Sequence, residues 1–257
     1  MLPYLRLGPF LLQTTGLALL LGIWVGSWLA EKEAVRLKIK PELVNNLIFF
    51  GLVGGLVGAR LAYAATYLNA YLANPLSLFA INTNTLSPFE GILIGLLVAF
   101  VYGQRKGLQL RPVLDALAPG LAVFMIFLGM AHLLNGDAYG APTKLPWGIF
   151  LWSEYRHPTQ VYEMLLAFGV TLVVLNHSIK DQGRGLNFLL MIFLSAAARV
   201  FLEGFRGDSL IWSGGFRAAQ VIGLIVMAGS LVFMRAWSHS QTNAREQESS
   251  AGGSNAS

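Results

Sequence analysis

Residues 113–134 read VLDALAPGLAVFMIFLGMAHLL, and no Asp, Glu, Lys or Arg follows Asp115 in this stretch. As a helix rising ~1.5 Å per residue, such a run crosses the roughly 30 Å hydrocarbon core of a bilayer. Its backbone polar groups would find no water there, so they must be satisfied within a helix. The stretch therefore predicts a transmembrane helix and, as the fold class, an all-α membrane protein.

The composition of the whole chain supports this class. Of the 257 residues, 55% are hydrophobic and only 12% are charged, against about 25% charged residues in a typical soluble domain. There is no cysteine, which excludes a disulfide framework, a thiolate metal site and a cysteine nucleophile. The net charge of +5 favours an anionic membrane surface, and we expect no nucleic-acid partner.

Seven windows are long and apolar enough to be spans of a helix bundle. They are Leu11–Ala30, Asn46–Thr66, Pro88–Gly103, Val113–Leu134, Val161–His177, Asn187–Gly204 and Ala218–Trp237. We therefore expect a polytopic domain over residues 1–237. Residues 238–257 are rich in Ser, Asn, Gln, Gly and Glu, and are predicted to form a disordered cytoplasmic tail.

The basic residues predict the orientation of the bundle. Most Lys and Arg residues fall in the connectors Glu31–Asn45, Gln104–Pro112 and Ser178–Leu186 or towards the C-terminal end. The positive-inside rule places these segments in the cytoplasm, with the N-terminus outside and the C-terminus inside. A small transporter is a weaker alternative, because no inverted repeat with matching broken helices is evident.

Charged residues inside the spans are the first candidates for a functional site, since each costs roughly 2.5–3.5 kcal/mol at mid-span. Arg199, Glu203 and Arg206 are spaced to share one helix face, with two guanidiniums around one carboxylate. Guanidinium groups bind phosphate oxygens in pairs, so this face predicts a lipid-phosphate site. The alternative is an Arg199–Glu203 ion pair that only neutralises itself.

Two further charged residues have both a functional and a structural interpretation. Arg60 lies at a comparable depth in the second span, where it could join the phosphate site or extend to the membrane surface. Asp115 lies one turn into the fourth span and could simply start that helix.

A polar segment follows the fourth span, and it contains His132, Asn135, Gly136 and Asp137. His157 precedes the fifth span. A histidine can act as a base near neutral pH, although a single interfacial histidine is more often structural. No His-x-x-Glu-His-like spacing is present, so we expect no metal ion.

Residues 156–163 read RHPTQVYE, which resembles the Arg-His-Pro-Ser-Gln-Leu-Tyr-Glu signature of bacterial prolipoprotein diacylglyceryl transferases. Four further stretches are similar to this family in order and spacing. They are Gly55–Tyr63, Asp115 with Ala118-Pro119, Asn135-Gly136-Asp137 with Gly140, and Arg199-x-x-x-Glu203-x-x-Arg206. The resemblance covers nearly the whole chain up to the seventh span.

Several positions depart from the family pattern. In Leu128–Asp137 the family arginine is Gly129 and the first family asparagine is His132; the histidine of its Phe-His-Gly-Gly turn is Glu90, and an early tyrosine is Thr15. Because the family uses such positions for catalysis, two alternatives follow. The chain is a divergent enzyme with a rearranged site, or a non-catalytic lipid-binding or scaffold descendant.

The resemblance implies transfer of the diacylglyceryl group from phosphatidylglycerol to the lipobox cysteine of a prolipoprotein signal peptide, in the bacterial inner membrane and without a cofactor. The expected catalytic residues are Glu90, His132, Arg199 and Glu203. Arg60, Arg199 and Arg206 would neutralise the lipid phosphate, and Glu90 or His132 would take the proton of the thiol. The expected supporting residues are Asp115, Asn135, Gly136 and His157.

Overall fold

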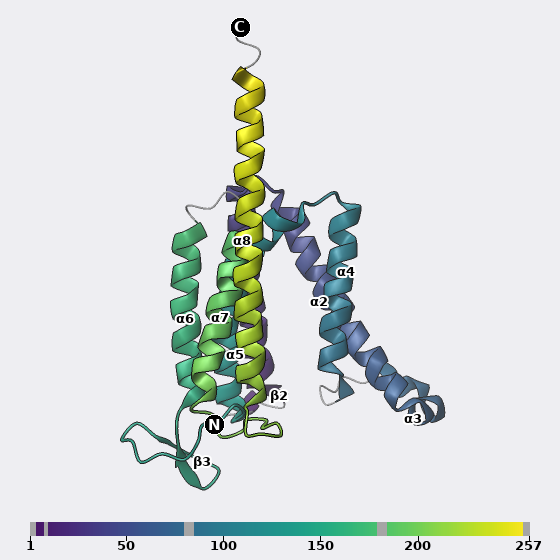
Figure 1. Ribbon diagram of the computed structural model, residues 1–257. Coiled ribbons are helices and arrows are strands. Elements are labelled where there is room, and N and C mark those ends of the chain that lie inside the picture. The colour runs from purple at the N-terminus through teal and green to yellow at the C-terminus, as the bar shows by residue number, and fades with distance from the viewer. Residues whose placement is uncertain (1–3, 8–9, 80–84, 179–183, 254–257) are drawn as a thin grey trace.

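The computed structural model describes residues 4–7, 10–79, 85–178 and 184–253, and it is a helix bundle with short hairpins at one end (Figure 1). The helices are α1 (Thr14–Arg36), α2 (Pro41–Thr66), α3 (Leu68–Ala73), α4 (Pro88–Arg105), α5 (Leu110–Asn135), α6 (Thr159–Ser178), α7 (Leu186–Glu203) and α8 (Ala218–Gly253), with the 3₁₀ helix η1 (Pro75–Phe79). The strands form two antiparallel hairpins, β1 (Tyr4–Leu7) with β2 (Phe10–Gln13), and β3 (Ile149–Leu151) with β4 (Glu154–Arg156). The predicted all-α class is confirmed.

Six helices, α1, α2, α5, α6, α7 and α8, are long and apolar enough to cross a membrane. The third predicted span is also helical, as α4, but its 18 residues include Glu90 and Arg105 near the ends, and it is not among the six. The β1–β2 hairpin and the far end of α8 lie at opposite ends of the bundle (Figure 1). This arrangement fits seven crossings, and the direction of insertion stays a prediction.

Helix α5 is the centre of the bundle and packs against α1, α6 and α7. Half of its apolar window is buried inside the protein, against 17% for α8 at the periphery. Small side chains make this close packing possible: a core cluster joins Ala118 and Ala122 of α5 to Val170 and Val174 of α6 and Met191 of α7. The large apolar side chains instead face outwards, as expected for a lipid-exposed surface.

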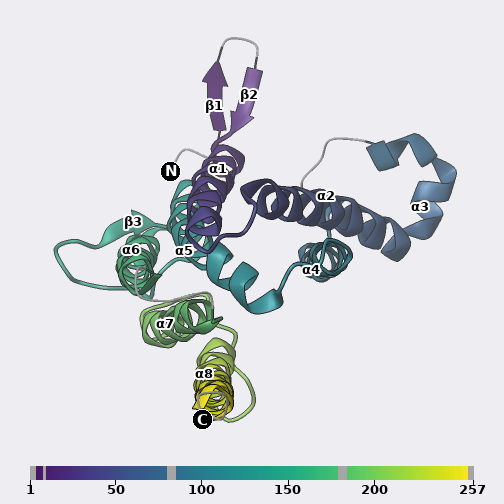
Figure 2. The same ribbon diagram turned by 90° about the horizontal axis from the view of Figure 1, so that it is seen from above.

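Helices α2 and α4 form a separate pair at one side of this group (Figure 2). Their backbones approach closely because glycines face each other. A Cβ on Gly55 would lie 3.1 Å from the carbonyl oxygen of Gly91, and a Cβ on Gly95 would lie 2.8 Å from that of Gly51. Glycines spaced by four, such as Gly51 and Gly55, predict such close packing in the second span, and these contacts confirm it.

Helix α8 continues through Gly253, well beyond the boundary expected at Trp237. The polar composition after Ser238 had predicted disorder, whereas the backbone there is helical. Because residues 254–257 and the side chains after Ser238 lie outside the described part of the chain, the disordered tail stays a prediction.

Candidate active site

The candidate site lies where α5 ends, α6 begins and α7 ends, at the same end of the bundle (Figure 1). Helix α5 stops because Gly136 adopts a left-handed conformation with φ 83°, which glycine adopts without steric cost. The backbone N–H groups of Gly136 and Asp137 both donate to the carbonyl of His132, at 2.8 and 3.1 Å. This cap fixes the last turn of α5, which carries His132.

The first residues of α6 hold the loop that follows α5. The buried hydroxyl of Thr159 donates to the carbonyl of Ala138 at 2.6 Å, and the amide of Gln160 donates to the carbonyl of Asp137 at 2.7 Å. Gln160 is fully buried. Thr159 and Gln160, which follow the Arg-His-Pro part of the motif directly, thus fix the start of α6 against the loop at the end of α5.

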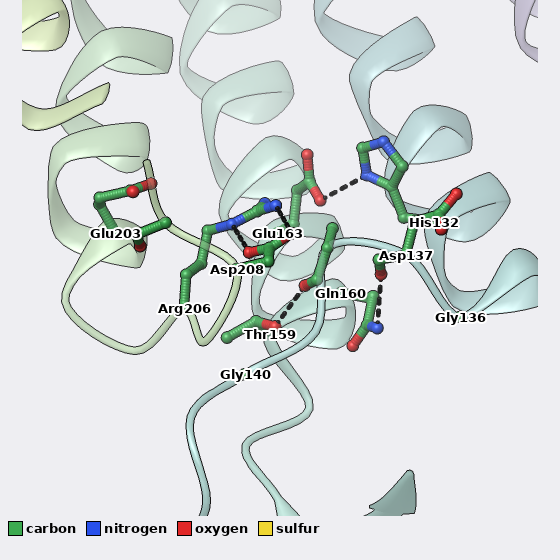
Figure 3. Close-up of polar contacts among 12 residues, drawn as sticks. His132, Gly136, Asp137, Gly140, Thr159, Gln160, Glu163, Glu203, Arg206 and Asp208 are labelled. Carbon is green, nitrogen blue, oxygen red and sulfur yellow. Dashed lines mark hydrogen bonds and ion pairs between the residues drawn. The ribbon is translucent and has the colours of Figure 1, made fainter. Parts of the chain in front are cut away.

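His132 and Glu163 face each other across the α5–α6 contact (Figure 3). Nδ1 of His132 lies 3.0 Å from Oε2 of Glu163, and the side chains are 29% and 15% exposed. The sequence marked His132 as a site candidate, whereas Glu163 appeared only as the last residue of the RHPTQVYE motif. The pairing makes Glu163 a site residue that the sequence prediction missed.

Arg199 and Glu203 form the ion pair that their spacing predicts. Nη2 of Arg199 lies 3.3 Å from Oε2 of Glu203. That oxygen has no hydrogen-bond partner within the described residues, so the contact is an ion pair without hydrogen-bond geometry. Glu163 and Arg199 both line a cavity of about 50 Å³ between α5, α6 and α7, so the structure brings the His132–Glu163 pair and Arg199 into one neighbourhood.

Arg206 does not join this face, which corrects the sequence prediction. Helix α7 ends at Glu203, and the chain after it forms turns. Arg206 therefore does not continue the helical spacing of Arg199 and Glu203. The guanidinium of Arg206 instead binds both carboxylate oxygens of Asp208, at 2.8 and 2.7 Å. One guanidinium, rather than two, is therefore paired with Glu203.

The sequence places Arg217 in the connector before the seventh span, which predicts contact with solvent, and this prediction is wrong. Its side chain is half-buried and donates to the backbone carbonyl of Glu203. It also donates to the carbonyl of Arg206 at 3.3 Å and to the hydroxyl of Ser209 at 3.2 Å. Arg217 therefore holds the end of α7 and the segment after it.

Arg60 lies on α2 and Glu90 on α4, a pair of helices that Figure 2 shows apart from α6 and α7. The guanidinium of Arg60 donates to the carbonyls of Leu78 and Ser77, at 2.9 and 2.6 Å. It also binds the hydroxyl and the carbonyl of Thr85. Glu90 is exposed in the first turn of α4. The structure thus brings neither residue to Arg199.

Asp115 stands at the other end of α5, about 25 Å from His132 by helical rise. Its buried carboxylate accepts hydrogen bonds from the backbone N–H of Gly185 at 2.5 Å and of Phe188 at 2.9 Å. It therefore caps the start of α7 rather than its own helix, as carboxylates do at helix N-termini.

Two other predicted supporting residues lie beside the candidate site. The amide of Asn135 donates to the carboxylate of Asp137. The ring of His157 packs 5.4 Å from that of Phe205, centroid to centroid, and its Nδ1 is buried with no hydrogen-bond partner among the described residues. The contact of His157 with Phe205 is thus one of packing. Among the described residues, no three His, Asp or Glu side chains are grouped to hold a metal ion.

A sequence model of a family described as prolipoprotein diacylglyceryl transferase matches residues 3–236. The chain belongs to this family. A protein of Clostridioides difficile (strain 630) named phosphatidylglycerol–prolipoprotein diacylglyceryl transferase is 31% identical over 217 residues, which are 84% of this chain and 87% of that protein. A protein of Gloeobacter violaceus with the same name is 32% identical over 232 residues, 85% of this chain and 86% of its own length.

Within this family, the structure gives a reason why an arginine is absent at Gly129. A Cβ on Gly129 would lie 2.8 Å from Cγ of Met164 and 3.3 Å from its backbone nitrogen. Helices α5 and α6 are so close here that the present arrangement has no room for a long side chain. One turn further along, the same close approach brings His132 to Glu163.

Proposed function

We propose that this multi-pass membrane protein transfers the diacylglyceryl group of phosphatidylglycerol to the thiol of a lipobox cysteine in a prolipoprotein, in the bacterial inner membrane. The observation that carries the proposal is the neighbourhood of His132, Glu163 and Arg199 at one end of an apolar bundle. It supplies a candidate base and a candidate phosphate ligand, which the reaction needs together.

In this proposal, Nε2 of His132 takes the proton of the thiol, because the thiolate is the nucleophile. The sulfur forms a C–S bond to the glycerol carbon of the diacylglyceryl group. The C–O bond to the phosphate breaks, and its electron pair leaves with glycerol phosphate. The proton held by His132 can then pass to this leaving group, so that protons and charge balance.

Arg199 would stabilise the negative charge that develops on the leaving phosphate. Its side chain is 40% exposed, so its outer part can meet a lipid headgroup. The cavity that it lines is small, at about 50 Å³. The headgroup would therefore bind on the exposed side of Arg199 and not inside this cavity.

The test is a transfer assay with the purified chain in phosphatidylglycerol vesicles and a peptide that carries a lipobox cysteine. We expect a thioether-linked diacylglyceryl peptide and glycerol phosphate in equal amounts, and no product from the Cys→Ser peptide. Glu90 is the second candidate base, and Glu90→Gln should retain the rate if His132 is the base. Binding of phosphatidylglycerol without any transfer, while the Clostridioides difficile relative reacts in the same assay, would support the non-catalytic alternative.

A further inference from the structure

We infer that Glu163 is a positioning residue for His132, and this inference rests on the proposed function. The carboxylate of Glu163 accepts a hydrogen bond from Nδ1–H of His132, which fixes the tautomer and leaves Nε2 as the atom that takes the thiol proton. The negative charge of Glu163 also stabilises the imidazolium that forms when the proton arrives.

The geometry of the pair supports this role. The two atoms are 3.0 Å apart, and both side chains are mostly buried, at 29% and 15% exposure. A hydrogen bond to an ionised group is stronger when water is largely excluded. The imidazole of His132 therefore has one preferred orientation, and Figure 3 shows its ring turned towards the carboxylate.

The surrounding structure fixes the distance between the two residues. Gly129 lets α5 approach Met164, the neighbour of Glu163 on α6. Thr159 and Gln160, one turn before Glu163, bind the loop that caps α5. The distance between α5 and α6 is thus fixed by contacts on both sides of the His132–Glu163 pair along α5. Glu163 therefore needs no conformational change to reach His132.

The charged groups around the pair come from two directions. From α7, Arg199 lines the same cavity as Glu163, and Glu203 is paired with Arg199. Beyond the end of α5, Asp137 is exposed and is bound by the amide of Asn135. Glu163 is therefore the carboxylate in direct contact with the imidazole in the described part of the chain, and its substitution should affect the orientation of His132 most directly.

The experiment measures kcat and KM of Glu163→Gln, a substitution that keeps size and removes charge. We expect kcat to fall about 10- to 100-fold, less than the ~10²–10⁴-fold that a general base itself contributes, with the KM for phosphatidylglycerol nearly unchanged. Glu163→Asp, which keeps the charge, should recover part of the wild-type kcat.

A second measurement distinguishes two roles of Glu163: orienting the imidazole of His132, or only holding α6 against α5. In a His132→Gln background, Glu163→Gln should cause less than about a twofold further loss, because the two residues act as one unit. The matched control is Glu33→Gln, which removes a buried carboxylate paired with Arg36 on α1 and should retain the wild-type rate.

The outcomes distinguish the inference from the proposed function. A wild-type kcat in Glu163→Gln, or losses that multiply in the double variant, would overturn the positioning role while the transferase activity stands. If Glu163→Gln does not fold, the decision passes to Glu163→Asp: a folded variant that recovers none of the wild-type kcat would overturn the role. No transfer by the wild type would overturn the proposed function itself.

Discussion

Arg199 and Glu203 form an asymmetric ion pair on the last turn of α7. Their nearest side-chain atoms are 3.3 Å apart, yet the guanidinium side chain is 40% exposed and that of Glu203 only 1%. The buried carboxylate thus holds one side of a cation whose other side faces outwards. Such a cation has the orientation needed to meet an anionic headgroup, and the carboxylate fixes its position.

We predict that Arg199→Ala lowers the transfer rate by about 100- to 1000-fold, the usual effect of removing one group that stabilises transition-state charge. Arg199→Lys should retain part of the rate, because the charge stays but the forked geometry is lost. Thermal unfolding of each variant checks that Glu203 does not destabilise the fold when it is unpaired. Equal, small losses in Arg199→Ala and Glu203→Ala would indicate a purely structural pair.

Arg217→Ala should destabilise the protein, contrary to the mild effect that its sequence position suggests. It removes donors to the carbonyls of Glu203 and Arg206, and hydrogen bonds from a charged group contribute about 1.5–3 kcal/mol each. We expect a lower unfolding temperature and a reduced transfer rate, measured on the same preparation. The exposed Lys144 provides the control, and Lys144→Ala should change neither quantity. An unchanged unfolding temperature in Arg217→Ala would contradict the role assigned to it.

Gly129→Val should lower the transfer rate by more than tenfold. A Cβ at this position already lies 2.8 Å from Cγ of Met164, and overpacking of this kind typically costs about 1–3 kcal/mol. The added methyl groups would push α6 away from α5 and lengthen the His132–Glu163 distance. Gly169 of α6 has open space around it, so Gly169→Ala is the matched control. Equal rates in the two variants would show that the helix separation does not matter.

The N-terminus should lie outside and the end of α8 in the cytoplasm, because basic residues concentrate in the connectors at that end. Reporter fusions at both ends measure this. A reporter that is active outside when fused after α8 would place His132 and Arg199 at the inner leaflet, opposite to the side where secreted prolipoproteins present their cysteine.

The helices could be predicted from the sequence because span length and apolar character are local properties. The fourth predicted span, residues 113–134, lies within α5 and is shorter than it by three residues at the start and one at the end. The hairpins and η1 could not be predicted in this way, because short polar and aromatic segments have no comparable periodicity. Helix α8 extends beyond the predicted end at Trp237. The polar composition of this segment indicates solvent exposure, but it does not exclude a helix.

The site could be predicted only in part. The Arg199–Glu203 pair follows from a spacing of four within one helix. The His132–Glu163 contact joins residues 31 positions apart on two helices, so no local pattern shows it. Arg206 leaves the face predicted for it because α7 ends at Glu203, which the sequence does not show, and its phosphate contact stays a prediction. Arg60 binds carbonyls of a segment that folds back onto α2, which a span-by-span prediction also cannot show.

The most direct test of the account is the single-turnover rate of diacylglyceryl transfer by the wild type and by His132→Gln, with phosphatidylglycerol and a lipobox peptide both saturating. If His132 takes the thiol proton, the substitution should slow the chemical step by about 100-fold or more, and raising the pH to supply preformed thiolate should restore part of the loss. A His132→Gln protein that transfers the group at the wild-type rate across the pH range would contradict the account.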